Sequence, residues 1–482
     1  MDSARSNRGQ EGGSGREVSA AELARQQEFT ALLRELLADR YPDPAVPPKA
    51  LVRTFGCQGN EADGERIRGM LCAAGYELTD TPEEASLILY NTCAVREHAE
   101  DRAFGNVGRL KSLRQGKKDL RVGLCGCMVQ QPHAAQKIRD SFSFVDLVFG
   151  THAIHRLPEL LYRLLSSGRR VFDLAEEPGR IAEGLPVRRE SGFRAWLPIM
   201  YGCDNFCSYC VVPLVRGRER GRRPELIIRE ARELMEAGYK EITLLGQNVN
   251  SYRCGDYDFP RLLRELDEIG GEYWLRFMTS HPKDCSPALL DTMATGRHIA
   301  KHLHLPVQSG SDRVLREMNR GYDAARYLDV ASYARQVMPG LSMTSDVIVG
   351  FPGETYEDFR DTLALVARME YTSLFTFLYS PREGTRAAAL PDPVPRAEKV
   401  RWFQELTALQ EGIAARRGAE SVGRELRVLC EGRGKRQALA GRSEGSVVVE
   451  FDGPEELIEQ FADVRVTKAQ NWLLDGALVQ DL

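Results

Sequence analysis

The sequence has no apolar run long enough to cross a lipid bilayer. Of its 482 residues, 43% are hydrophobic and 28% are charged, as in ordinary globular proteins. No stretch of about 18 apolar residues occurs. The first twenty residues, MDSARSNRGQEGGSGREVSA, lack the apolar core of a secretory signal. We therefore expect a cytoplasmic protein with no membrane partner.

The chain also has little net charge, no internal repeat and no disulfide pattern. A net charge of −4 gives no overall indication of a nucleic-acid partner, so the evidence for such a partner has to come from local clusters of basic residues. The eleven cysteines are odd in number and follow no secretory signal, which argues against a disulfide framework. Packing, metal ligation and redox chemistry remain as roles for these thiols.

The pattern of the N-terminal third predicts an extension followed by an α/β domain. Residues 1–48 form the extension: 1–15 are predicted to be disordered, apolar residues recur at helical spacing over 18–40, and YPDPAVPPKA is a linker. Over 49–170, strands are expected at LVRTFG, SLILYNT, LRVGLCG and FVDLVFG, with helices near 62–75, 97–114, 130–140 and 154–166. This alternation predicts a doubly wound parallel sheet.

Two further domains are expected. Residues 189–418 contain six strand-like runs, AWLPIMYG, EITLLG, YWLRFMT, HLHLPV, TSDVIVG and SLFTFLYS, which predict a partial (βα)6 barrel. Residues 421–482 contain the short β-prone stretches RELRVLCEG, SVVVEF, DVRVTKAQ and GALVQDL, which predict a small β-barrel. The fold class is therefore α/β with a C-terminal β-domain.

The strongest local motif is CxxxCxxC, formed by Cys203, Cys207 and Cys210 directly after the first barrel strand. Clustered thiolates favour a soft metal centre. A closed zinc site needs a fourth ligand, and no cysteine or histidine follows nearby. Three ligands on a four-iron cluster leave one iron open for chemistry.

This motif resembles the radical S-adenosylmethionine (SAM) superfamily. The resemblance implies that the open iron chelates the amino and carboxylate groups of SAM, and that Tyr209 lies beside the adenine. Polar residues at other strand ends are further candidates for SAM contacts: Gln247, Asn248, Ser280, His281, Gln308, Ser309 and Gly350. For His281, a structural hydrogen-bonded role is an equal alternative, and Gly350 and Gly353 favour a tight turn or close backbone approach.

A second cysteine group is dispersed along the α/β domain. Cys57, Cys93 and Cys127 each follow an expected strand, at intervals of 36 and 34 residues. Loops after successive parallel strands gather at one edge of a sheet, so these thiols can meet there. Cys125 competes with Cys127 as third ligand. For the remaining cysteines we expect ordinary packing roles: Cys72, Cys254, Cys285 and Cys430.

Two such groups in this order, with a small C-terminal β-domain, resemble the methylthiotransferase family over about residues 50–482. Cys127 is preferred to Cys125 because the family pattern continues Gly-Cys-Met, as here. The branch that modifies isopentenylated adenosine in tRNA is indicated by YGCDNFCSYCVVPLVRGRERGR, ITLLGQNVNSY, HLPVQSGSDRVLREMNRGY, DVIVGFPGE and LYSPREGT. This sequence departs from the family pattern at two positions. Gly59 stands where a larger residue is expected, and Gly64 stands where Ser is expected.

Two regions are candidates for RNA contact. RGRERGRR carries five arginines in eight residues, Arg216, Arg218, Arg220, Arg222 and Arg223, whose planar guanidinium groups suit phosphate and bases. A solvated charge run is the alternative. The C-terminal part resembles the RNA-binding TRAM module. Its charge does not support RNA binding unaided, because from Ser421 onward eight basic residues face eleven acidic ones, a net of −3.

The resemblance implies radical methylthiolation of carbon 2 of the isopentenylated adenosine beside the anticodon. Two 4Fe-4S clusters and SAM are the implied cofactors, with Cys57, Cys93 and Cys127 holding the auxiliary cluster that delivers the methylthio group. Implied partners are tRNA and a low-potential electron donor of flavodoxin or ferredoxin type. We expect a monomer and leave the sulfur source open. The rivals are the same chemistry on threonylcarbamoyl-adenosine or on a ribosomal-protein aspartate, and a non-catalytic iron–sulfur RNA-binding protein.

Overall fold

The computed structural model describes residues 17–95, 99–174, 179–470 and 472–479. The chain divides into two compact units. The first comprises Met1–Glu190, Tyr201–Cys203 and Val211–Arg220, and the second comprises Ser191–Met200, Asp204–Cys210 and Gly221–Leu482. The disorder predicted for residues 1–15 falls outside the described residues. None of the described helices combines the length and the apolar character needed to span a membrane.

The first unit is built on a six-stranded sheet in the order β2-β1-β3-β4-β5-β6, with every neighbouring pair parallel. The strands are β1 (Lys49–Thr54), β2 (Glu77–Leu78), β3 (Leu87–Thr92), β4 (Arg121–Gly126), β5 (Leu147–Phe149) and β6 (Val171–Asp173). The doubly wound parallel sheet expected from the sequence is confirmed. The short strands β2 and β6 were not predicted.

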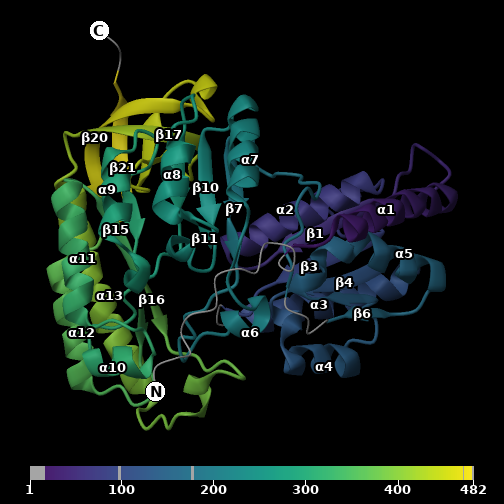
Figure 1. Cartoon of the computed structure of the whole chain (residues 1–482), viewed down its shortest axis with the longest axis horizontal. Coiled ribbons are helices and arrows are strands. Elements are labelled where there is room, and N and C mark those ends of the chain that lie inside the picture. Colours follow the sequence, from purple (N-terminus) through teal and green to yellow (C-terminus); the bar gives the residue numbers. More distant parts are fainter. Residues whose placement is uncertain (1–16, 96–98, 175–178, 471, 480–482) are drawn as a thin grey trace. The chain divides into compact units, whose positions relative to one another are not determined.

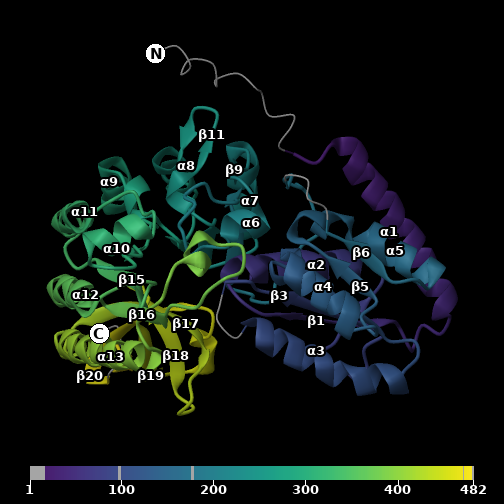
Figure 2. The ribbon, with the colours of Figure 1, turned by 90° about the horizontal axis from the view of Figure 1, so that it is seen from below.

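Helices cover both faces of this sheet. They are α1 (Ala20–Arg40), α2 (Gln58–Ala73), α3 (Ala99–Gly116), α4 (Pro132–Ser141) and α5 (Leu157–Ser167). The same unit contains the 3-10 helices η2 (Met128–Gln130) and η3 (Thr151–Arg156) and the short helix α6 (Val212–Arg216), which contacts η3. One apolar core joins the sheet to α1, α2 and α5, and a second joins it to α3 and α4. Figure 2 shows α1 and α3 on opposite sides of β1. The strand order changes direction at β1 and β3, where open α/β sheets bind ligands.

The second unit contains six parallel strands in two groups of three, β7-β10-β13 and β14-β15-β16. A bridge between Leu275 and Ile299 connects the groups. The strands are β7 (Arg194–Pro198), β10 (Glu241–Leu245), β13 (Trp274–Phe277), β14 (His302–His304), β15 (Ser342–Val349) and β16 (Ser373–Leu378). Each falls on one of the six runs expected from the sequence, which confirms the partial barrel.

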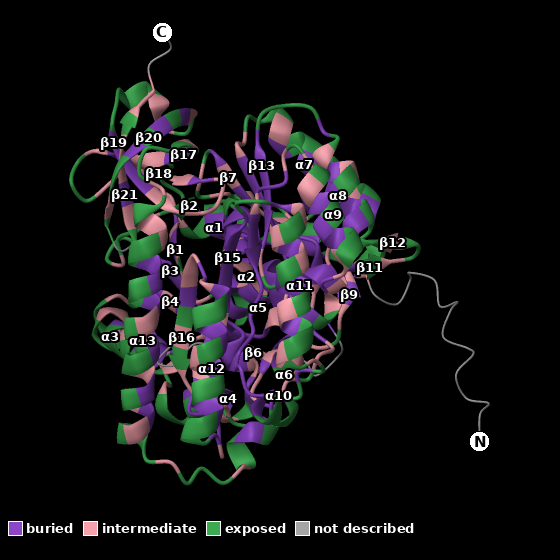
Figure 3. Ribbon diagram, turned by 90° about the vertical axis from the view of Figure 1, so that its left-hand side faces the viewer, coloured by how far each residue is buried: buried purple, intermediate pink, exposed green. Residues whose placement is uncertain are grey.

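Helices wrap this partial barrel, as Figure 1 shows. They are α7 (Pro224–Glu236), α8 (Phe259–Asp267), α9 (Pro287–Thr295), α10 (Asp312–Glu317), α11 (Ala324–Val337), α12 (Tyr356–Met369) and α13 (Arg396–Ala419). Figure 3 shows the outward faces of α11, α12 and α13 exposed, with buried strands behind them. The short pair of β11 (Arg253–Cys254) with β12 (Tyr257–Asp258) completes this unit. The strands β8 (Met200–Tyr201) and β9 (Arg220–Gly221) form a separate two-stranded sheet.

The C-terminal strands form a closed barrel in the order β17-β18-β19-β21-β20. They are β17 (Glu425–Arg433), β18 (Leu439–Ser443), β19 (Val448–Asp452), β20 (Phe461–Gln470) and β21 (Leu473–Leu478). The predicted small β-barrel is confirmed, although β18 was not foreseen. Arg276 of β13 donates to the carbonyls of Ser443 and Glu444, so the small barrel lies at the end of the large one where strands begin. The opposite end, where strands finish, is left for a site.

Candidate cluster and cofactor sites

Cys57, Cys93 and Cys127, here called the strand-end cysteines, each follow a strand of the first unit directly. Cys57 precedes α2 after β1, Cys93 follows β3, and Cys127 follows β4 and precedes η2. Strands β1, β3 and β4 are neighbours in the sheet, and parallel strands end at the same edge. The topology therefore brings the three thiols together, as the sequence predicted.

Asn60 orients this group of thiols. Its amide oxygen lies 3.6 Å from Sγ of Cys127 and 3.9 Å from Sγ of Cys57. Its amide nitrogen donates to the carbonyls of Phe55 (3.1 Å) and Thr92 (2.9 Å), which fixes the side chain. The sequence argument missed Asn60, although it lies directly after Gly59, one of the two positions at which the sequence departs from the family pattern.

Gly56 allows Cys93 to approach the same turn. A Cβ atom at Gly56 would lie 2.9 Å from Sγ of Cys93 and 2.5 Å from its Cβ, and the φ of Gly56 is +131°. Only glycine satisfies both the close approach and this backbone conformation. Each of the three sulfurs therefore lies near the segment from Gly56 to Asn60.

The donor set fits an iron–sulfur cluster better than a single ion. Among the described residues, no three Cys, His, Asp or Glu side chains converge on one metal ion. In a cluster each thiolate binds a different iron, so its ligands need not converge on one point. Burial raises the pKa of Cys127 to about 12, opposed by the positive charge of Arg216. Metal ligation requires the thiolate form, so metal binding has to displace this proton.

The other cysteines of the chain differ in placement. Cys125 lies inside β4 and packs in the core that faces α1, α2 and α5, which supports Cys127 as the third member of the group. Cys285 and Cys430 are buried as expected for packing thiols, and Cys254 is half-buried. Cys72 is exposed, so the packing role expected for it is wrong. It lies near the end of α2, where the helix turns its face to solvent.

Gly64, which departs from the family pattern, has a local steric explanation. A Cβ at this position would lie 2.4 Å from Oγ1 of Thr54 in β1. Threonine at position 54 and a residue larger than glycine at position 64 therefore exclude each other at this spacing. Gly59 is half-buried, and nothing in the structure explains the absence of a larger side chain there.

Cys203, Cys207 and Cys210, here called the loop cysteines, are described with their own units. Cys203 belongs to the first unit, is buried, and its amide donates to the carbonyl of Gly217 (3.2 Å). Cys207 and Cys210 belong to the second unit and are half-buried in one tight turn, in which the amide of Cys210 donates to the carbonyl of Cys207 (3.0 Å).

Arg320 is the main residue of this region that the sequence argument missed. It is 5% exposed, and its Nη1 lies 3.2 Å from Sγ of Cys207 and 3.2 Å from the hydroxyl of Tyr209. Its other nitrogens donate to the hydroxyl of Tyr322 (2.9 Å) and the carbonyl of Pro306 (3.0 Å). Arg320 lies in the quoted stretch MNRGY, but its burial beside a cysteine could not be read from that motif.

Several polar atoms at the strand ends of the second unit are buried and lack hydrogen-bond partners. They are Oδ1 of Asn248 after β10, and Oγ of Ser280 and Nε2 of His281 after β13. Gln247, beside Asn248, is half-buried. Leaving such atoms unpaired costs about 1–3 kcal/mol each. This cost favours a polar ligand there and fits SAM.

His281 has a defined protonation state. Its Nδ1 accepts a hydrogen bond from the amide of Lys283 (3.2 Å), so the proton of the neutral ring is on Nε2. Burial, with the charges of Arg320 and Lys283, lowers the pKa of His281 to about 2. The ring also meets Tyr322 edge to face, with centroids 5.6 Å apart. His281 is therefore a neutral hydrogen-bond donor without a partner among the described residues.

Three other expected SAM contacts have structural partners in the second unit. Ser309 is fully buried, and its hydroxyl lies 3.3 Å from Oγ1 of Thr362 and accepts from the amide of Ser311 (3.2 Å). The carbonyl of Gly350 accepts from Nζ of Lys399 (2.7 Å). Gln308 has a φ of +72°, and its amide and carbonyl pair with β15. Ser309 and Gly350 thus have partners within the fold, and the φ of Gly350, +76°, agrees with the tight turn that the sequence favoured there.

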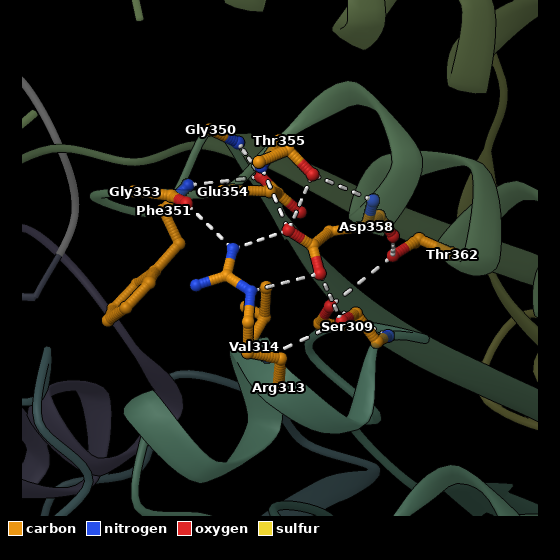
Figure 4. Close-up of polar contacts among 11 residues, drawn as sticks. Ser309, Arg313, Val314, Gly350, Phe351, Gly353, Glu354, Thr355, Asp358 and Thr362 are labelled. Carbon is orange, nitrogen blue, oxygen red and sulfur yellow. Dashed lines mark hydrogen bonds and ion pairs between the residues drawn. The ribbon is translucent and has the colours of Figure 1, made fainter. Parts of the chain in front are cut away.

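The turn between β15 and α12, residues 350–355, is held by hydrogen bonds to two carboxylates, as Figure 4 shows. The carboxylate of Glu354 accepts from the amides of Gly350 and Phe351, and Asp358 accepts from Arg313 and from the amide of Thr355 (2.9 Å). Burial raises the pKa of Glu354 to about 7, against the lowering effect of the two amide donors. Hydrogen bonds from Arg313 and its neighbours hold the pKa of Asp358 well below its usual range, although burial raises it.

Three family models match the chain. The radical SAM superfamily matches residues 197–366, an uncharacterized protein family, UPF0004, matches residues 49–150, and the TRAM domain matches residues 419–479. These segments correspond to the partial barrel, the doubly wound sheet and the closed β-barrel. Membership of the radical SAM superfamily implies SAM and a 4Fe-4S cluster as cofactors.

Curated relatives cover nearly the whole chain. A tRNA-2-methylthio-N(6)-dimethylallyladenosine synthase of Thermoanaerobacter sp. (strain X514) is 46% identical over 89% of this chain and 92% of its own length. Synthases of the same name from Acetivibrio thermocellus and Desulforamulus reducens are 43% and 47% identical, over 96% and 89% of this chain and 98% and 95% of theirs. The chain belongs to this family.

A solved structure supports the fold of this methylthiotransferase family member. The radical SAM methyltransferase TsrM from Kitasatospora setae matches 70% of this chain and 77% of its own, with a TM-score of 0.53 and 14% identity. At that identity the likeness concerns the fold alone.

The arginine-rich stretch of this methylthiotransferase is not a continuous surface patch. Arg216, Arg220 and Arg222 are 6%, 9% and 4% exposed, whereas Arg218 and Arg223 are exposed. Arg222 donates to the carbonyl of Pro198 (2.6 Å) and pairs with Glu230. Arg216 and Arg220 are buried in the first unit. The three buried arginines therefore depart from the expected RNA contact, because a packed guanidinium cannot reach a phosphate.

The TRAM barrel has one basic run without intervening acidic residues, formed by Arg433, Lys435, Arg436 and Arg442, and its arginines are paired. Arg433 pairs with Glu455, Arg436 with Glu450 and Asp475, and Arg442 with Glu431. The pairs of Arg433 with Glu455 and of Arg442 with Glu431 lie at the surface, where an ion pair contributes at most about 1 kcal/mol, so phosphates can replace these carboxylates at little cost. Lys435 in the same run is exposed.

Proposed function

We propose that this chain methylthiolates carbon 2 of N(6)-dimethylallyladenosine at position 37 of tRNA, using SAM and two 4Fe-4S clusters. The relatives named for this reaction cover most of the chain. The observation that carries the second cluster is the gathering of Cys57, Cys93 and Cys127 at neighbouring strand ends. These strand-end cysteines hold the auxiliary cluster, and Cys203, Cys207 and Cys210 hold the radical SAM cluster.

The substrate explains why such cofactors are needed. An aromatic C–H bond offers neither an acidic proton nor a leaving group, so acid–base or nucleophilic side chains do not activate it. When bound and reduced, the radical SAM cluster supplies the electron that cleaves SAM and yields a hydrogen-abstracting radical. No side chain of this protein is assigned as an acid or base.

The side chains of the second unit bind and orient SAM. Tyr209, whose hydroxyl is held by Arg320, offers an aromatic face to the adenine. The unpaired Nε2–H of His281 donates to an acceptor of the cofactor, and Asn248 contributes its unpaired amide oxygen. Gln247 lies in the same loop. Gln308, Ser309 and Gly350 support the shape of this region, with Gly350 keeping the backbone in the turn.

RNA contact is proposed for two separate parts of the chain. Arg218 and Arg223 are the exposed arginines of the basic stretch, and their planar groups suit phosphate. The TRAM barrel offers its ion-paired basic run, in which phosphates would replace carboxylates. We expect binding by both parts to weaken as salt rises.

The remaining partners follow from the chemistry. A low-potential donor of flavodoxin or ferredoxin type supplies the electron, and the enzyme acts as a monomer in the cytoplasm, where its tRNA substrate is made and used.

Iron and sulfide content tests the two clusters. The wild type is expected to hold two clusters after anaerobic reconstitution, and the Cys57/Cys93/Cys127 triple alanine variant one. A triple alanine variant of Cys72, Cys254 and Cys430 is the matched control and should keep both. An unchanged iron content in the strand-end variant would contradict the second cluster.

Mass spectrometry of tRNA nucleosides tests the substrate. A deletion strain without a paralogue should lose the 2-methylthio dimethylallyl nucleoside. Persistence of that nucleoside rules out the proposed substrate. If reconstituted protein with intact clusters, dithionite and SAM releases no 5′-deoxyadenosine, the non-catalytic RNA-binding alternative is favoured instead.

A further inference from the structure

A buried arginine contacts one of the strand-end cysteines. Arg216 ends α6, and its Nε lies 3.1 Å from Sγ of Cys127. Its Nη2 lies 2.8 Å from Oδ1 of Asn60 and 2.7 Å from Oδ2 of Asp63. One guanidinium thus joins a candidate iron ligand, the residue that orients the group, and a carboxylate.

The position of Arg216 is fixed by packing. Val211 and Val215 pack with Ala94 and Cys127 in one small apolar cluster of the first unit. The hydroxyl of Thr151 donates to the carbonyl of Val215 (2.8 Å), immediately before Arg216. The guanidinium is therefore held against Cys127.

The charge of Arg216 is balanced by Asp63. Asp63 is 3% exposed, and its ion pair with Arg216 is close but not aligned as a hydrogen bond. Arg66 faces the other carboxylate oxygen at 3.8 Å. Burying such a pair seldom adds stability, because desolvation offsets the attraction. A stabilising role alone therefore explains the pair poorly.

We propose that Arg216 and Asp63 are positioning residues that set the reduction potential of the auxiliary cluster through Cys127. The inference rests on the proposed function, because it presupposes a cluster on the strand-end cysteines. Hydrogen bonds to ligand sulfurs and nearby charge are established levers on cluster potentials.

The sign of each effect follows from charge. Reduction adds negative charge to the cluster and its sulfurs, and the N–H donor of Arg216 stabilises that charge. Removing Arg216 also leaves Asp63 unbalanced, so the potential falls. Removing the charge of Asp63 leaves Arg216 unbalanced, so the potential rises. Removing both charges returns the potential toward the wild-type value.

The experiment uses the full chain with Cys203, Cys207 and Cys210 changed to alanine, so that only the auxiliary cluster is present. Redox titration followed by electron paramagnetic resonance is compared for Arg216→Gln, Asp63→Asn, the double variant and the control Arg109→Gln, which is exposed on α3. We expect shifts in opposite directions for the single variants, each about tenfold in the one-electron equilibrium or about 59 mV. The control should not shift.

Arg216→Lys keeps the charge without the planar fork and covers the case in which Arg216→Gln loses its cluster. Its potential should fall less than that of Arg216→Gln. Retained clusters with unchanged potentials in Asp63→Asn and Arg216→Lys overturn the inference, as do shifts of the same sign in Asp63→Asn and Arg216→Gln. If the starting variant, with Cys203, Cys207 and Cys210 changed to alanine, holds no iron, the proposed second cluster is contradicted instead. The two failures are therefore distinguishable.

Discussion

The strand-end cysteines and the loop cysteines both have a buried arginine nearby, but only one of the two arginines pairs with a carboxylate. In each, a buried arginine lies beside one sulfur: Arg216 at 3.1 Å from Cys127 and Arg320 at 3.2 Å from Cys207. Arg216 is balanced by the carboxylate of Asp63. The partners of Arg320 are two tyrosine hydroxyls and a carbonyl, and within the described residues no carboxylate pairs with it.

This difference indicates what each region receives. An unbalanced buried cation is costly, so the surroundings of Arg320 favour the arrival of negative charge. On the proposed function, thiolates on iron and the carboxylate of SAM would supply such charge. In the region of the strand-end cysteines the protein already supplies the counter-charge. On the proposed function, the first region therefore already balances the charge of its arginine, whereas the second gains a counter-charge only when its cluster and SAM bind.

The largest expected effect separates the two regions by SAM cleavage. A triple alanine variant of Cys203, Cys207 and Cys210 should abolish 5′-deoxyadenosine formation, because SAM loses its iron. The triple alanine variant of the strand-end cysteines should still form 5′-deoxyadenosine and make no methylthiolated tRNA. Chromatography of the products of the dithionite reaction measures both. Equal loss of 5′-deoxyadenosine in the two variants would contradict the expected difference between the two cysteine groups.

The next effect concerns the stability of the protein without clusters. Arg216→Met leaves Asp63 buried beside one distant arginine and should cost about 3 kcal/mol of unfolding free energy. Arg320→Met leaves no carboxylate unbalanced and should cost less, about 1–2 kcal/mol, for the hydrogen bonds that the hydroxyl of Tyr322 and the carbonyl of Pro306 lose. Denaturant titration of the apoproteins, with Arg109→Met as an exposed control, checks this. Similar losses in the two buried variants would show that charge balance is not the difference.

The third prediction concerns how the stability of the protein depends on pH through Glu354, a buried carboxyl group of the second unit. The pKa of Glu354 rises from 4.5 to about 7 on folding, so the folded protein binds the proton more tightly. The stability that this proton contributes is present at low pH and is lost as pH rises from about 4.5 to about 7. The stability of the wild type relative to Glu354→Gln should fall by about 3 kcal/mol over that window.

Thermal unfolding of the apoproteins at pH 5, 6, 7 and 8 measures this relation. Glu357→Gln, exposed on α12 next to the same turn, is the control and should show no such trend above pH 5. A relative stability of Glu354→Gln that is constant with pH is incompatible with the expected shift.

The smallest expected effect concerns one hydrogen bond to SAM. His281→Ala removes the unpaired Nε2–H donor and should raise the dissociation constant of SAM about tenfold, or about 1.4 kcal/mol. His298→Ala is the control, because both of its ring nitrogens lie near backbone carbonyls, of Asp267 (2.9 Å) and Gly271 (3.1 Å). Equilibrium binding of SAM to the reconstituted protein measures both. Equal affinities in the two variants would assign His281 to the fold.

Much of the architecture could be predicted from the sequence. Apolar runs followed by amphipathic segments indicated the parallel sheet and the partial barrel, because strands buried on both faces are continuously apolar and helices buried on one face show helical periodicity. Short strands such as β2 and β18 were missed, because two to five residues carry too little pattern. The strand-end cysteines were predicted to meet, since parallel strands end at one edge.

The assignments that depend on burial could not be predicted in this way. Arg216, Arg220 and Arg222 alternate with exposed neighbours in one stretch, and every arginine there looks alike in sequence. Ser309 and His281 both follow barrel strands, yet Ser309 has structural partners and Nε2 of His281 has none.

The cysteine spacing predicts which residues bind iron and which strand ends carry them. The tertiary structure alone decided which charges face those cysteines. Arg216 meets Cys127 across 89 residues of chain, and Arg320 meets Cys207 across 113. The physical reason is that a charge is buried only when partners from elsewhere in the fold surround it, and these partners leave no local pattern in the sequence.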